Sequence, residues 1–122
     1  MRNQPKYTIF KNTSYPLESL KDILKTETSF KIELAFGIVL IPFLIYVDLG
    51  LLTKLIMFIS MMGVLIAETI NSSIERVVDL VTLDHHIMAK RAKDVGSTVV
   101  FLSIFVFITV WGSILIEKYI FF

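Results

Sequence analysis

Three carboxylates and one amide fall on one face of a predicted helix in the stretch AETINSSIERVVD, residues 67–79. An α-helix turns about 100° per residue, so Glu68, Asn71, Glu75 and Asp79 lie within an arc of about 80°, and the aliphatic residues of this stretch lie opposite. Carboxylates gathered in this way can hold a hard divalent cation, and Mg²⁺ typically takes one or two carboxylates together with phosphate oxygens. The stripe therefore indicates metal-assisted phosphate chemistry.

Basic residues follow the acidic stripe in HHIMAKRAKDVGS, residues 85–97, where Lys90 and Lys93 precede the next apolar stretch. Cations close to a metal-binding face suit a bound nucleoside triphosphate. Phosphoryl transfer needs charge neutralisation and a base at the attacking hydroxyl, and little covalent chemistry. Glu68 adjoins a long apolar run, so partial desolvation suits it to be the base, while Glu75 lies further along and suits the metal.

Two other interpretations fit parts of this pattern. A run of charge is most often a solvated helix face, and an ionisable residue beside a membrane span could also serve a non-enzymatic oligomeric proton or cation carrier. The carrier explains Glu68 but gives no role to Asn71, Glu75, Lys93 or Asp94. The chain has no cysteine, which excludes thiolate catalysis, and it contains neither GxxxxGK[ST] nor GxGxxG, so a kinase of this kind would not have a standard nucleotide-binding fold.

The elements that must position these residues are predicted to be membrane-spanning helices. With 55% hydrophobic residues and a mean hydropathy of +0.74, the 122-residue chain is too apolar for an ordinary soluble domain, and we expect a single all-α membrane domain over residues 1–122. Windows of about 20 residues predict three spans. These spans cover about residues 33–47, 51–67 and 95–116, the second continuing as a cytoplasmic helix to about residue 81.

An amphipathic surface helix is predicted ahead of the first span, over about residues 16–31. Leu17, Leu20 and Leu24 share one helical stripe, and Pro16 suits the first helical position. Basic residues gather before the first span and between the second and third, so the positive-inside rule predicts a cytoplasmic N-terminus and a C-terminus on the outside. Three helices cannot shield a polar site from lipid, so we expect a symmetric homo-oligomer. A net charge of only +1 gives no indication of nucleic-acid binding.

The stretch ETINSSIERVVD, followed by AKRAKDVGS at residues 89–97, resembles the signature of the prokaryotic diacylglycerol kinase family, the small integral membrane lipid kinases. The pattern E-x-x-N-[ST]-x-I-E-x-x-x-D and then A-K-D-x-G-S fixes many polar positions at set offsets, and the order of predicted elements extends the resemblance over nearly the whole chain. The resemblance implies a homotrimer in the bacterial inner membrane that phosphorylates the hydroxyl of diacylglycerol from MgATP and so makes phosphatidic acid.

The resemblance also implies roles for individual residues. Glu68 matches the catalytic base, and Glu27 and Glu75 match the carboxylates that bind Mg²⁺. Residues that match contacts to ATP are Tyr15, Glu27, Asn71, Glu75, Asp84, His86, Lys93 and Asp94. Residues that match positions around the lipid substrate are Ser29, Glu33, Lys54, Ser97 and Trp111. Tyr15 and Trp111 could instead be interfacial aromatic residues, and Ser97 could bond a neighbouring helix.

Two positions depart from the family pattern. Thr8 stands where many members carry an arginine that reaches the nucleotide, and Lys90 replaces a small residue close to it. Relatives that phosphorylate undecaprenol tend to begin their third span with small residues other than Gly-Ser after the Lys-Asp pair. The KDVGS stretch at residues 93–97 therefore favours diacylglycerol, with undecaprenol as the alternative substrate.

Overall fold

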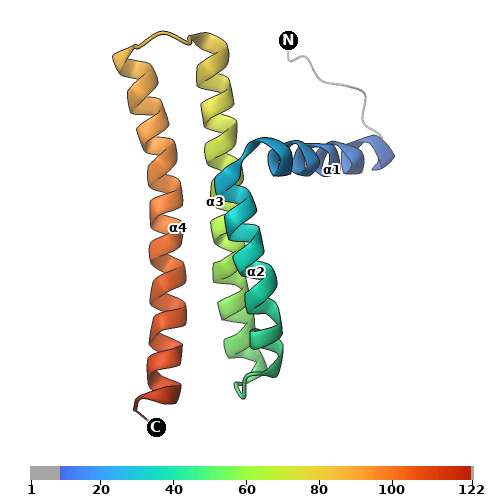
Figure 1. Ribbon diagram of the computed structural model, residues 1–122, viewed down its shortest axis with the longest axis vertical. Helices are drawn as coiled ribbons and strands as arrows, with labels where there is room; N and C mark the ends of the chain where they lie inside the picture. The colour runs from blue at the N-terminus through green and yellow to red at the C-terminus, as the bar shows by residue number, and fades with distance from the viewer. Residues whose placement is uncertain (1–8, 122) are drawn as a thin grey trace.

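The structure, a computed structural model, describes residues 9–121, and within this range every regular element is a helix. The helices are α1 (Ile9–Thr26), α2 (Thr28–Tyr46), α3 (Leu51–Val81) and α4 (Ile87–Tyr119). Figure 1 shows α2, α3 and α4 along the long axis, with α1 running across them from the start of α2. Three of the helices, α2, α3 and α4, are long and apolar enough to cross a membrane. The expected all-α class with three candidate spans is therefore confirmed for the described residues.

The first helix begins earlier than expected. It starts at Ile9, which puts Pro16 in its interior, so the prediction of Pro16 at the first helical position is wrong. A proline inside a helix lacks the N–H that would bond the carbonyl four residues earlier. That carbonyl belongs to Asn12, which is exposed, so water can take the place of the missing donor. Thr8, at one of the two departures from the family pattern, lies outside the described residues.

The chain changes direction at Glu27. The surface helix was expected to continue to about residue 31, but α1 ends at Thr26 and α2 begins at Thr28. Glu27 is extended, with φ −110° and ψ 106°, and Figure 1 shows α2 leaving α1 at this point in a new direction. The first span is consequently the 19-residue helix α2 and includes Ser29, Phe30 and Glu33, instead of starting at about residue 33.

The second span is part of a longer helix. At about 1.5 Å per residue, the 31 residues of α3 measure about 46 Å, whereas the hydrocarbon core of a bilayer is about 30 Å thick. The polar stretch from Glu68 to Val81 therefore extends beyond the hydrocarbon, and α4 begins again at Ile87, well before the span expected from residue 95. In Figure 1 the α3–α4 hairpin rises past the level of α1, so the stripe and the basic residues are at the same end of the molecule as α1.

A small core joins α2, α3 and α4 near their other end. It consists of Leu44, Met57, Met61 and Trp111, and we call it the tryptophan core. The indole Nε1 of Trp111 donates to the carbonyl oxygen of Met57 at 3.0 Å, and its ring packs against Phe43 and Phe107. Most other apolar side chains of these helices are exposed. Such exposure suits residues that face lipid, because lipid tails are as apolar as the side chains themselves.

Candidate active site

A small polar cavity lies where the end of α1, the start of α2 and the acidic face of α3 meet. Its volume is about 70 Å³, room for a metal ion and a few oxygen atoms but not for a whole nucleotide. The residues that line it are Ile23, Glu27, Ser29, Phe30, Glu68, Asn71, Ser72 and Glu75. We call it the carboxylate cavity. It brings together the expected base, both expected metal ligands and one of the expected lipid contacts.

Polar side chains of α3 orient the two expected metal ligands. The hydroxyl of Ser72 donates to Glu27 Oε1 at 2.8 Å, and the amide Nδ2 of Asn71 donates to Glu75 Oε1 at 3.2 Å. Glu27 can reach α3 because it is the residue at which the chain turns from α1 into α2. Each carboxylate therefore has one oxygen engaged by a fixed donor and a second oxygen available as a ligand.

Close packing of α3 against α4 holds Asn71. A Cβ atom added to Gly96 would lie 2.5 Å from Asn71 Oδ1 and 3.4 Å from carbons of Ile74, so no larger residue fits at position 96 without a shift. Asn71 Oδ1 is buried and has no hydrogen-bond partner among the described residues. A buried acceptor without a hydrogen-bond donor costs free energy unless a bound ligand supplies the donor. Such acceptors are typical of functional positions.

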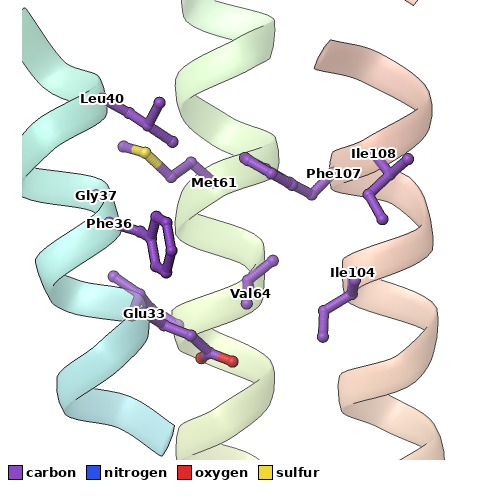
Figure 2. A pocket seen from close by; sticks show the side chains of 10 residues that line it. Glu33, Phe36, Gly37, Leu40, Met61, Val64, Ile104, Phe107 and Ile108 are labelled. Carbon is purple, nitrogen blue, oxygen red and sulfur yellow. The ribbon is translucent and has the colours of Figure 1, made fainter. Parts of the chain in front are cut away.

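Glu33 on α2 lies beside Glu68 on α3. Glu33 also lines an apolar groove of about 360 Å³ between α2, α3 and α4, which is the size of a small-molecule site. Figure 2 shows Glu33 at one end of this groove with its carboxyl group directed toward α3, and apolar side chains such as Phe36, Val64 and Ile104 around the rest.

A second polar cavity, of about 320 Å³, lies at the α3–α4 loop. Four residues with expected nucleotide contacts line it: Asp84, His86, Lys93 and Asp94. Lys93 Nζ donates to Asp79 Oδ1 at 2.8 Å, and Asp79 lies one turn beyond Glu75 on α3. This cavity, which we call the loop cavity, therefore lies further along α3, one turn beyond a residue of the carboxylate cavity.

Some groups in the loop cavity also have local partners. Lys90 Nζ donates to Asp94 Oδ2 at 2.7 Å within α4, so the lysine that departs from the family pattern pairs with an expected nucleotide contact. His86 caps α4, and its Nδ1 accepts from the backbone N–H of Met88 at 3.0 Å. Capping leaves the other ring nitrogen of His86 for a ligand.

Other expected site residues are not brought to these cavities. Tyr15 is exposed on α1 and lines neither cavity. Trp111 is buried in the tryptophan core, where Met57, its hydrogen-bond partner, lies about 16 Å from Glu68 along α3. Lys54 lies still further away, about 21 Å along α3, and its Nζ donates to the carbonyl oxygen of Ile45 at the hairpin turn. Ser97 is exposed and follows Gly96 at the α3–α4 contact.

The donor set of the carboxylate cavity fits Mg²⁺ only in part. Among residues 9–121 no three His, Asp or Glu side chains are close enough to hold a metal by themselves. Glu27 and Glu75 supply two hard oxygen ligands in one cavity, which is the protein share that Mg²⁺ usually takes when phosphate oxygens complete its octahedron. The site therefore suits a metal that arrives with a phosphate.

Sequence reasoning missed several residues of this site. Ser72 is four residues after Glu68 and three before Glu75, so its helical spacing alone could have identified it. The need for a glycine at position 96 and the contact of Arg76 with Asp22 join segments far apart in the chain, and no local spacing indicates them.

Comparison with known proteins identifies the family of the chain. The model of the family described as prokaryotic diacylglycerol kinase matches residues 14–115, a range that includes every expected site residue. The chain belongs to the prokaryotic diacylglycerol kinase family. Proteins named diacylglycerol kinase from Haemophilus influenzae, Pseudomonas aeruginosa and Escherichia coli are 35%, 32% and 31% identical to it, each over 88% of this chain and over 91%, 88% and 88% of their own lengths.

Family membership confirms the resemblance noted in the sequence and makes the chain a lipid kinase of a bacterial membrane. Family membership favours the kinase over the cation carrier. The carrier hypothesis gives a role to Glu68 alone, whereas the family pattern also includes the other polar residues of the stripe. A kinase also needs a phosphate donor, and the carboxylate cavity and the loop cavity are the polar cavities that could accommodate one.

Proposed function

We propose that this protein transfers the γ-phosphoryl group of MgATP to the hydroxyl of diacylglycerol and releases phosphatidic acid and ADP. One observation carries the proposal: Glu33 lines the apolar groove, and the neighbouring Glu68 lines the cavity of polar ligands. A lipid alcohol and a water-soluble phosphate donor must meet at such a boundary. The names of the relatives supply the lipid class.

In this mechanism Glu68 is the general base. It accepts the proton of the lipid hydroxyl as the oxygen attacks the γ-phosphorus, and the bond to the ADP oxygen breaks. Mg²⁺, when bound with ATP, neutralises charge on the phosphate oxygens. Glu27 and Glu75 would hold that metal, and Lys93, released from Asp79, would contact phosphate oxygens.

The remaining nucleotide would extend into the loop cavity. Asp84, His86 and Asp94 line this cavity and offer acceptors and a ring nitrogen to ribose or base. Asn71 would contribute its buried Oδ1 at the phosphate end, where it has no partner among residues 9–121. Tyr15 stays a predicted nucleotide contact without a described neighbour in this region.

The lipid would lie in the apolar groove with its glycerol at the Glu33 end. Ser29 lines the carboxylate cavity, and Ser97 lies next to the α3–α4 contact, so both are near that end. Trp111 packs on Phe107, which lines the groove, and would shape the groove from behind. Lys54 stays a predicted lipid contact at the opposite end of the span.

We also propose that the chain works as a homotrimer in the bacterial inner membrane, with the N-terminus in the cytoplasm and the C-terminus outside. The basic residues near the polar cavities support this orientation. Exposed Leu17 and Leu20 support a position of α1 on the membrane surface. The apolar groove between α2, α3 and α4 supports coverage by neighbouring subunits.

A lipid kinase assay tests the proposal. The purified full-length protein in mixed micelles is given γ-labelled ATP and Mg²⁺ with either diacylglycerol or undecaprenol. We expect labelled phosphatidic acid, and no product when lipid or Mg²⁺ is omitted. Exclusive formation of undecaprenyl phosphate would change the substrate but keep the chemistry, and absence of any labelled lipid would refute the kinase proposal.

A further inference from the structure

Arg76 joins α3 to the end of α1 through contacts that the proposed chemistry leaves unused. Its Nη1 donates to Asp22 Oδ2 at 2.5 Å, and its Nη2 donates to Thr26 Oγ1 at 3.2 Å. The same Nη2 lies 3.6 Å from Glu27 Oε1. Asp22 and Thr26 are in the last turn of α1, and Glu27 follows directly. One guanidinium therefore contacts three residues around the place where the chain changes direction.

The conformation of Glu27 makes these contacts relevant to the site. Its carboxylate position depends on how α1 and α2 meet, because it is the single extended residue between them. Ser72, one turn before Arg76 on the same face of α3, donates to that carboxylate at 2.8 Å. Thus two residues of α3 act on this region: Ser72 fixes the carboxylate of Glu27, and Arg76 fixes α1, the helix that precedes Glu27.

An isolated exposed ion pair contributes little to stability, and both partners here are about half exposed, 46% for Arg76 and 52% for Asp22. Arginine differs from lysine in presenting a planar fork of donors with fixed directions. Three partners on one fork restrict where α1 can lie more than a single pair would. The expected consequence is a constraint on position, with little effect on unfolding.

We propose that Arg76 is a positioning residue for phosphoryl transfer, which fixes the last turn of α1 against α3 so that Glu27 and Glu75 face one metal ion. This inference rests on the proposed function, because that function assigns both carboxylates to Mg²⁺. Arg76 itself lines neither polar cavity. Its effect therefore passes through Glu27.

A distance measurement tests the positional part without using activity. The chain has no cysteine, so Glu18→Cys on α1 and Ser73→Cys on α3 give a unique pair for spin labels, diluted with unlabelled chain. We expect one narrow distance distribution with Arg76 present and a broad one with Arg76→Gln. Lys25→Gln removes a charge from the same turn of α1 and is the matched control, which keeps the narrow distribution. An unchanged distribution in Arg76→Gln overturns the proposal.

A Mg²⁺ titration of kinase rate tests the functional part. We expect Arg76→Gln to raise the half-saturating Mg²⁺ concentration about 10-fold, as loss of groups that orient metal ligands commonly does, with an unchanged KM for lipid. Arg76→Lys keeps the charge but loses the planar fork, so its half-saturating Mg²⁺ concentration should stay closer to that of Arg76→Gln than to that of the parent. A parent-like titration in Arg76→Gln overturns the proposal even if the distances broaden. An inactive parent would contradict the proposed function alone, and the distances would then decide on Arg76 by themselves.

Discussion

The two ends of the helical bundle are held together by different interactions. At the tryptophan core, α2, α3 and α4 meet through close packing and one indole hydrogen bond to a backbone carbonyl. At the polar end, α1, α2 and α3 meet through side-chain hydrogen bonds and ion pairs, and α4 comes close because residue 96 is a glycine. The tryptophan core depends mainly on close packing of apolar side chains, whereas the polar end depends on hydrogen-bond donors and acceptors at defined positions. We therefore expect substitutions to affect stability at one end and chemistry at the other.

Glu68→Gln is expected to give the largest difference between an effect on turnover and an effect on stability. The amide keeps the shape but cannot accept the hydroxyl proton, so turnover should fall by about 10²–10⁴-fold. Thermal unfolding and oligomeric state should stay close to those of the parent. Parent-like turnover in this variant would remove Glu68 from the role of base.

Glu75→Gln and Glu27→Gln should have the next largest effect, because each removes one anionic ligand from the carboxylate cavity. We expect the half-saturating Mg²⁺ concentration to rise by about 10–100-fold in each. Glu18→Gln, on the exposed part of α1, is the matched control. If the Mg²⁺ titrations of all three variants coincide with the parent, the metal site lies elsewhere.

Gly96→Ala tests the close contact of α3 and α4 at the polar end. The added carbon would lie 2.5 Å from Asn71 Oδ1, so either the Asn71 side chain or the two helices must shift, at a cost of about 1–3 kcal/mol in unfolding free energy. Activity should fall as well, because Asn71 orients Glu75. Gly112→Ala is the control, since its Cβ would meet no atom within 4 Å and should leave both quantities unchanged or slightly improved. Equal behaviour of the two variants would contradict the close contact.

Trp111→Phe should have the smallest effect on the reaction. Loss of the hydrogen bond to Met57 and of part of the ring should lower unfolding free energy by about 1–2 kcal/mol, with turnover within about twofold at low temperature. Turnover as low as that of Glu68→Gln in a folded Trp111→Phe would show that the tryptophan core takes part in the chemistry, and the contrast between the ends would fail.

The common helix face of the acidic stretch is the part of the candidate site that the sequence predicted and the structure shows. Glu68, Asn71 and Glu75 follow from a periodicity that an α-helix imposes at any position in the chain, and α3 keeps them on one side as expected. The three apolar spans follow from composition for a similar reason. Local regularity is therefore sufficient for the class of fold and for part of the site.

Other features of the fold and the site depend on tertiary contacts, so local periodicity and composition do not predict them. The position of Glu27 depends on a break between two helices, which the apolar pattern across residues 16–31 does not mark. Pro16 was placed at a helix start because its local preference is for that position, yet an exposed helix tolerates it in the interior. Trp111 matches a lipid position in the family, but only packing shows that it is buried beside Met57.

The break at Glu27 links the site to the lipid bilayer around it. Bilayer thickness sets the tilt of a spanning helix such as α2, and surface charge and lipid packing set the depth of a helix such as α1. If Glu27 binds Mg²⁺ as proposed, its carboxylate lies between these two helices and responds to both, whereas Glu75 belongs to α3 and responds to neither directly. The composition of the host membrane should therefore change the metal affinity of this kinase before it changes the intrinsic rate of the chemical step.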